Sequence, residues 1–138
     1  MPIRWPAIMA APVQDPDMPA DIPVKIVPVP QYLGQHEGQY AFAYTIHITN
    51  ESDVAVTLQN RHWIITHGDG RSEEVVGEGV VGEQPELPPG ASYSYTSGAF
   101  IPTRTGSMRG SYGFLAADGR SFRAEIPEFA LLAPDSLH

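Results

Sequence analysis

The stretch Gln39–Asn50, QYAFAYTIHITN, carries the strongest pattern in the chain. Aromatic and β-branched residues occupy every second position, at Tyr40, Phe42, Tyr44, Ile46 and Ile48. Alternate side chains of an extended chain point to opposite faces, so a period of two predicts a strand with one buried face. We therefore expect a long, half-buried antiparallel strand here, with Phe42 in the core.

The segment before this strand favours a second one. Residues 22–30, IPVKIVPVP, alternate well enough for a strand, but three prolines remove the amides that an interior strand needs. We predict an edge strand over 22–30, followed by a polar turn over 33–38.

The segment after it predicts a turn and another strand. Residues 50–53, NESD, are typical of a turn, because their side chains hydrogen-bond to their own backbone. A strand then starts at Val54 and runs to Thr66, with a bulge or kink at 59–60. Trp63 is expected to be its core tryptophan. The next tight turn is His67-Gly68-Asp69-Gly70.

The C-terminal half repeats this pattern. Alternating segments over 92–100 and 106–116 predict strands, and Asp118-Gly119 predicts a hairpin into a strand over 122–126. A last short strand is expected over 128–133. Because no window has a helical period, we predict an all-β fold, an immunoglobulin or fibronectin type III-like sandwich of two antiparallel sheets with about seven or eight strands.

Length and composition set the domain organisation. A chain of 138 residues favours one domain. Five prolines in the first nineteen residues argue against regular structure there, so we divide the chain into a proline-rich arm, 1–21, and a domain, 22–138. The chain has no cysteine, which excludes disulfides, thiolate metal sites and a cysteine nucleophile.

The charge balance bears on partners. Sixteen acidic against eight basic residues give a net charge of -8, the wrong sign for binding nucleic acid or an anionic membrane. No stretch has the length of a membrane span or a signal peptide, so we expect a cytoplasmic protein. A protein partner is expected, and Trp5 in the arm leaves a homo-oligomer open.

The glycine-rich stretch 77–82, GEGVVG, matches the GxGxxG pattern of dinucleotide-binding loops. Prolines at 85, 88 and 89 prevent the helix that such a loop needs, and Glu78 and Glu83 place negative charge beside the proposed phosphate site. A bulged loop that needs glycine for its backbone is favoured, and an anion-binding loop is the alternative. Its candidate residues are Gly77, Gly79, Val80, Val81 and Gly82.

No catalytic or metal site is expected. His62 and His67 are five residues apart on one strand, so their side chains should point to opposite faces and cannot share an ion. The chain lacks the GxSxG nucleophile elbow and any triad that the pattern would bring together. We therefore predict a non-enzyme without a cofactor.

A recognition surface is the better use of the polar residues near the central strand. Arg61 provides a planar donor fork of the kind found at interface hot spots, and His62 is its neighbour. Our candidate interaction surface consists of Arg61, His62, Glu83 and Gln84.

Several longer strings resemble the ApaG family, also called CorD, from about Ile22 to His138. They are YAFAYTIHITN, LQNRHWIIT, GEGVVGEQPELPPG, YTSGAF, GSMRGSYGF and IPEFALLAP. The resemblance implies a fibronectin type III-like sandwich and a bacterial cytoplasmic protein. The family's glycine signature falls on Gly77, Gly79 and Gly82.

The same resemblance implies two classes of function. The family is linked genetically to cobalt resistance, magnesium efflux and diadenosine polyphosphate metabolism, and similar eukaryotic domains are joined to F-box proteins and to a polymerase-interacting protein. The first class is a non-catalytic interaction module. The second is a binder of a pyrophosphate-containing nucleotide, with or without Mg²⁺ or Co²⁺, at the glycine-rich loop.

Overall fold

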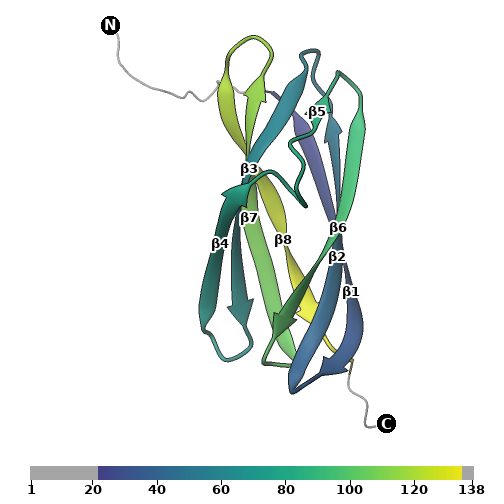
Figure 1. Ribbon diagram of the computed structural model, residues 1–138, viewed down its shortest axis with the longest axis vertical. Helices are drawn as coiled ribbons and strands as arrows, with labels where there is room; N and C mark the ends of the chain where they lie inside the picture. The colour runs from purple at the N-terminus through teal and green to yellow at the C-terminus, as the bar shows by residue number, and fades with distance from the viewer. Residues whose placement is uncertain (1–21, 135–138) are drawn as a thin grey trace, which may run out of the picture.

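The computed structural model describes residues 22–134, and the expected arm, 1–21, lies outside them. Every element in this range is a strand, so the described residues contain no helix that could cross a membrane. The strands, labelled in Figure 1, are β1 (Val24–His36), β2 (Gln39–Asn50), β3 (Val56–His67), β4 (Ser72–Glu78), β5 (Glu86–Leu87), β6 (Ser92–Ile101), β7 (Thr105–Ala116) and β8 (Ser121–Leu132).

The strands form two antiparallel sheets that lie face to face (Figure 1). One sheet has the order β1-β2-β6, and the other has the order β4-β3-β7-β8 with β5 also paired to β3. The predicted sandwich of two antiparallel sheets is confirmed.

The core lies where the alternating residues of β2 meet the second sheet. Phe42 is 2 % exposed, and Ile46 and Ile48 are fully buried. Trp63 of β3 is also 2 % exposed, and its ring centroid lies 5.4 Å from that of Tyr44 and 5.9 Å from that of Phe129. Edge-to-face contacts of this kind add to the area that the rings bury. The predicted core positions of Phe42 and Trp63 are confirmed.

A bulge in β3 decides which side chains face this core. The register of β3 against β7 shifts between Leu58 and Asn60, where the sequence predicts a bulge. An extra residue reverses the alternation of a strand. Even-numbered Val56 and Leu58 are therefore buried before the bulge, and odd-numbered Trp63 is buried after it.

Two sequence predictions are wrong in their boundaries. Strand β1 does not end at residue 30 but runs to His36, because a register shift between Tyr32 and Gly34 absorbs an extra residue and keeps β1 paired with β2. Likewise, the strands expected over 122–126 and 128–133 are one strand, β8. Its register against β7 shifts between Met108 and Gly110, which places Pro127 in a bulge where its missing amide costs no ladder bond.

The two long sides of the sandwich differ. On one side β1 packs against β8, and the sheets close over the core there. On the other side the outermost strands are β4 and β6, from opposite sheets. The glycine-rich loop follows β4, so the open side contains most of the candidate functional residues.

Candidate functional site

The glycine-rich loop is a tight hairpin. The Val80 amide donates to the Glu83 carbonyl at 2.8 Å, and the Glu83 amide donates back to Val80 at 2.9 Å. The two residues between them, Val81 and Gly82, have φ angles of 41° and 82°. Positive φ at both central residues is the arrangement of a type I′ turn. In a dinucleotide-binding loop the glycines lie between a strand and a helix, whereas here they lie in a β-turn.

Each motif glycine has a separate structural reason. Gly79 has a φ of 66°, and a Cβ there would lie 2.3 Å from the Glu83 carbonyl oxygen. Gly77 allows close approach instead, since its Cβ would lie 2.8 Å from the guanidinium carbon of Arg61. Gly82 needs only its positive φ, because a Cβ there would meet no atom within 4 Å. The GxGxxG spacing therefore satisfies the backbone of this hairpin.

The same hydrogen bonds limit what the loop could offer an anion. The Gly79 amide donates to the carbonyl of Gln59 at 2.8 Å, and the Val80 amide is engaged by Glu83. An anion nest needs several converging amides. Of the predicted donors, the amides of Val81 and Gly82 remain at the tip of the turn, and the anion-binding loop stays a prediction.

Two of the four residues predicted for the interaction surface hold this loop in place. The Nη1 atom of Arg61 donates to the carbonyls of Glu78 at 3.0 Å and Gly79 at 2.9 Å. The side chain of Gln84 donates to the carbonyl of Gln59 at 2.9 Å. A charge-assisted bond from arginine to backbone carbonyls is among the stronger hydrogen bonds. Arg61 and Gln84 therefore have a structural use that sequence reasoning missed.

The other two predicted surface residues are more accessible. Glu83 contributes its backbone to the hairpin and has an exposed side chain. The ring of His62 forms a hydrogen bond with Glu74 of β4 on the outer face of the sheet. A shallow hollow of about 250 Å³ lies beside this pair and is also lined by Val76, which is 73 % exposed, and Arg123. The predicted surface is thus divided between the loop and this outer face.

A cavity opens between the sheets on the side where β4 and β6 are outermost. Its volume is about 290 Å³. Trp63, Ile65 and Val75 from β3 and β4 form its apolar wall, and Ser97–Phe100 of β6 line the opposite side. Arg61 and Glu73 also line it, so the cavity has a guanidinium and a carboxylate beside its apolar wall.

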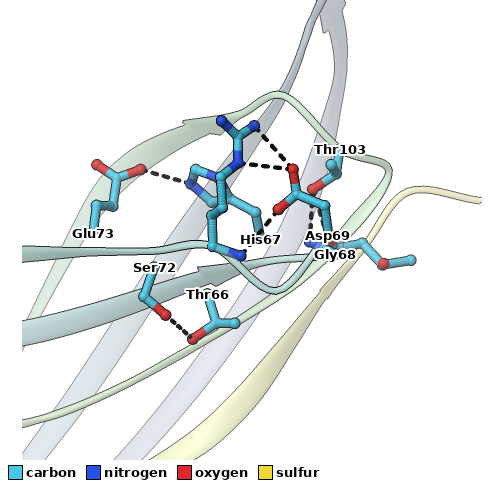
Figure 2. A network of polar contacts seen from close by, with 9 residues as sticks. Thr66, His67, Gly68, Asp69, Ser72, Glu73 and Thr103 are labelled. Atoms are coloured by element: carbon cyan, nitrogen blue, oxygen red, sulfur yellow. Dashed lines mark hydrogen bonds and ion pairs between the residues drawn. The ribbon is translucent and has the colours of Figure 1, made fainter.

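A contact from His67 holds that carboxylate in place, as Figure 2 shows. The Nε2 atom of His67 lies 2.8 Å from Glu73, and His67 is only 13 % exposed. A carboxylate accepts hydrogen bonds, so Nε2 is the donor. The Nδ1 atom of His67 is buried and has no partner among the described residues. The ring therefore acts as a support for Glu73.

The turn beside His67 has its own polar contacts. The Gly68 amide donates to the Thr103 hydroxyl at 2.8 Å, joining the β3–β4 turn to the β6–β7 turn (Figure 2). The amide of Arg71, followed by its guanidinium, donates to Asp69 and holds the pKa of that carboxyl below its ordinary value. Because Asp69 is bound to Arg71 and His67 to Glu73, these acidic groups do not converge on one point.

No catalytic constellation emerges from the described residues. His62 and His67 bind different glutamates, and residues 22–134 contain no group of three or more histidine, aspartate or glutamate side chains placed to hold a metal ion. The phenols of Tyr95 and Tyr112 form a buried hydrogen bond, and burial raises the pKa of both well above the ordinary value. A phenol that resists ionisation is a poor base.

Comparison with known proteins identifies the family to which this chain is similar. The ApaG domain family matches residues 30–116. Protein ApaG of Pseudomonas aeruginosa PAO1 is 53% identical over 110 residues, which cover 80% of this chain and 87% of that protein. Protein ApaG of Pseudomonas putida KT2440 is 45% identical over 126 residues, 91% of this chain and all of that protein.

A solved structure agrees with these sequences. A Bordetella pertussis protein solved under the name ApaA is 41% identical and superposes with a TM-score of 0.79, covering 83% of this chain and 97% of that one. Sequence identity of this extent over most of both chains shows that they share a family as well as a fold. This chain therefore belongs to the ApaG domain family.

Proposed function

We propose that the chain is a non-catalytic interaction module that binds another protein through the open side of the sandwich and its glycine-rich hairpin. The observation that carries the proposal is Val81, a β-branched residue that has a φ of 41° and is 54 % exposed. Neither the fold nor the solubility of the domain needs an apolar residue there.

Val81 stabilises neither the turn nor the core. A left-handed backbone costs an ordinary residue about 1–2 kcal/mol, and asparagine or glycine is the usual choice at this position of a type I′ turn. Strain at an exposed position suggests a functional use, because selection for stability alone would remove it. An exposed apolar side chain on a rigid hairpin is suited to contact a partner's surface.

The relatives add support of a limited kind. The curated relatives have the name Protein ApaG, which states no catalytic activity. The family's genetic links to cobalt resistance and magnesium efflux fit a module that acts through another protein. On this proposal the chain does not itself bind the ion.

Two substitutions at Val81 separate its effect on the stability of the domain from its effect on partner binding. Val81→Asn creates an Asn-Gly turn and should raise the free energy of unfolding by about 1 kcal/mol. Val81→Thr keeps the branched shape and the strain, and should leave stability nearly unchanged. Both remove the apolar contact, so both should weaken capture of partners from a bacterial lysate, measured with equal amounts of immobilised protein.

The outcomes distinguish the proposal from its alternatives. Undiminished capture by both variants would remove Val81 from the interface, and no specific capture by the parent chain would contradict the module itself. A nucleotide binder predicts that ADP with Mg²⁺ raises the melting temperature in a concentration-dependent way. We expect no shift, because the Gly79 and Val80 amides are already engaged.

A further inference from the structure

The outer edge of β6 differs from the other strand edges of the sandwich. Exposed edges invite pairing with another chain, and proteins normally block them with proline, charge or bulges. The sequence of β6, SYSYTSGAFI, contains no proline and no charged residue over its ten positions. Among the described strands, none pairs with this edge.

The other outermost strands have such protection. Strand β1 contains Pro28 and Pro30 and a bulge at Gly34. Strand β4 reads SEEVVGE, with three glutamates in seven residues. Strand β8 has Pro127 in a bulge and charged residues on both sides of it. The unprotected edge of β6 is therefore an exception within this molecule.

The hydrogen bonds of β2 identify the β6 residues that face outward. The Asn50 amide donates to Ala91, beside β6, whereas the Glu51 amide donates to Pro23, beside β1. Successive residues of an antiparallel strand direct their backbone groups to opposite sides. The β2–β6 register has no shift, so Tyr93, Tyr95 and Ser97 bond to β2.

The intervening residues must direct their amides and carbonyls away from β2. They are Ser94, Thr96 and Gly98, and all three residues are exposed. The same alternation places Pro28 at a position of β1 that faces away from β2, opposite Ile46, where it needs no amide. Strand β6 thus presents an uninterrupted row of unpaired amides and carbonyls, whereas Pro28 and Pro30 remove amides from the outer edge of β1.

The intersheet cavity lies directly beside this edge. A strand added to β6 would extend the three-stranded sheet over β4, and every second side chain would point toward the cavity wall. That wall is apolar at Trp63 and Val75, and Glu73 adds a carboxylate that is 49 % exposed. Arg61 also lines the cavity, but its Nη1 atom is engaged by the loop carbonyls.

We infer that β6 accepts an extended segment of a partner protein by strand addition, with apolar side chains entering the cavity and a lysine or arginine reaching Glu73. Backbone bonds give such complexes their affinity, and pockets for alternate side chains give them specificity. The inference rests on the proposed interaction function and names the partner's chemistry: extended, free of proline, apolar at alternate positions, and basic.

A second copy of this chain fits the edge less well. The core-facing side chains of its β6 are already covered by its own second sheet and could not enter the cavity. Each copy also has a net charge of -8 and an acidic β4 beside the edge. The chain's own residues 1–21 contain prolines at 2, 6, 12, 16 and 19, which interrupt the donors that a paired strand needs.

The test uses selected peptides and two matched variants of the full chain. A phage-displayed library of random nonapeptides is selected on the immobilised protein, and the enriched peptides are titrated by fluorescence anisotropy. Thr96→Pro removes one outward amide and adds a ring at the edge, whereas Thr96→Ala removes the same hydroxyl and keeps the amide. Thr96→Pro should weaken binding about tenfold or more, because one hydrogen bond is lost and the ring obstructs the edge, and Thr96→Ala should bind like the parent.

Two further variants and the sequences of the enriched peptides make the result interpretable. Ser94→Pro repeats the test if Thr96→Pro does not fold, as judged by circular dichroism. Glu73→Gln should weaken peptides that contain a basic residue and leave those without one unchanged. Enriched peptides should lack proline at their centre and have apolar residues at alternate positions.

Four outcomes would overturn the inference. Peptides that bind Thr96→Pro as well as the parent would place the interaction elsewhere and leave the proposed function standing. Concentration-dependent dimers that Thr96→Pro abolishes would make a second copy the occupant, and a protected Thr96 amide in the monomer without peptide would point to residues 1–21. Failure to enrich any peptide, together with no capture from lysate, would contradict the proposed function as well.

Discussion

The two sides of this sandwich are built from the same kind of strand and end differently. On the closed side, β1 and β8 pack together, and both have proline and a bulge. On the open side, β4 is acidic, β6 is uncharged and free of proline, and a cavity of about 290 Å³ lies between the sheets. The closed side resembles a finished core, whereas the open side resembles an interface.

The difference shows that protection against unwanted strand pairing varies from one edge of the sandwich to another. A domain gains nothing in stability from an unprotected edge, and such an edge is a liability for aggregation. An unprotected edge beside a cavity with one apolar wall, in a molecule whose other three edges are blocked, is what a strand-binding site requires. Four predictions follow the comparison from the largest expected effect to the smallest.

The largest effect should come from truncating the core. Phe42 is 2 % exposed and its ring packs against Tyr32 of β1, so Phe42→Ala should cost about 3–5 kcal/mol of unfolding free energy. Ile65 lines the open cavity, where neighbours can relax into existing space, so Ile65→Ala should cost about 2 kcal/mol. Urea unfolding measures both. Equal losses would remove the energetic distinction between the two sides.

Next in size are the glycines of the hairpin on the open side. Gly79→Ala meets both a φ of 66° and a carbonyl oxygen 2.3 Å away, and should cost about 3 kcal/mol. Gly82→Ala meets only a φ of 82° and should cost about 1 kcal/mol. Thermal unfolding of both variants tests the order. A tolerated Gly79→Ala would show that the hairpin is looser than its contacts indicate.

The buried tyrosine pair predicts a loss of stability in alkali. Burial raises the pKa of Tyr95 and Tyr112 above the ordinary value, so above about pH 10 the unfolded chain releases protons that the folded chain retains. Stability is therefore complete below pH 10 and should fall above it by up to about 1.4 kcal/mol per pH unit for each tyrosine.

A single substitution checks which groups cause this slope. Tyr95→Phe should reduce it, and at neutral pH should cost about 1–3 kcal/mol because the Tyr112 hydroxyl loses its buried partner. Urea unfolding at several pH values gives both quantities. A slope that Tyr95→Phe leaves unchanged would assign the alkaline loss to other groups.

The smallest effect concerns the blocked edge. Pro28→Thr restores an amide that faces away from β2, and should cost about 0.4–1 kcal/mol through the added freedom of the unfolded chain. Affinity for the peptides selected on β6 should not change, which anisotropy titration of the variant would show. Improved binding would mean that the β1 edge can accept the same segments.

Much of the fold could be predicted from the sequence, because strand alternation and tight turns are local signals. The core positions of Phe42 and Trp63, the bulge at 59–60 and the sandwich itself are confirmed. The lengths of β1 and β8 could not be predicted, because a bulge is defined by pairing with a distant strand. Pro127 signals a strand end locally and becomes tolerable only opposite β7.

The site was less predictable for the same reason. The spacing of GEGVVG identifies glycine positions, but the use of Gly77 depends on Arg61, sixteen positions earlier and on the neighbouring strand. The signal in the sequence was an arginine before the predicted turn at residues 67–70 and a glycine at a matching distance after it. The open edge of β6 needed the strand order of the whole sheet, which no local pattern contains.

Amide hydrogen exchange along β6, followed residue by residue by NMR in the full chain without ligand, tests the central claim most directly. The account predicts fast exchange at Ser94, Thr96 and Gly98, and slow exchange at Tyr93, Tyr95 and Ser97, which bond to β2. Alternating protection of this kind would establish an open edge. Uniformly slow exchange along β6 would show that the edge is already covered, and would contradict the claim that it awaits a partner's strand.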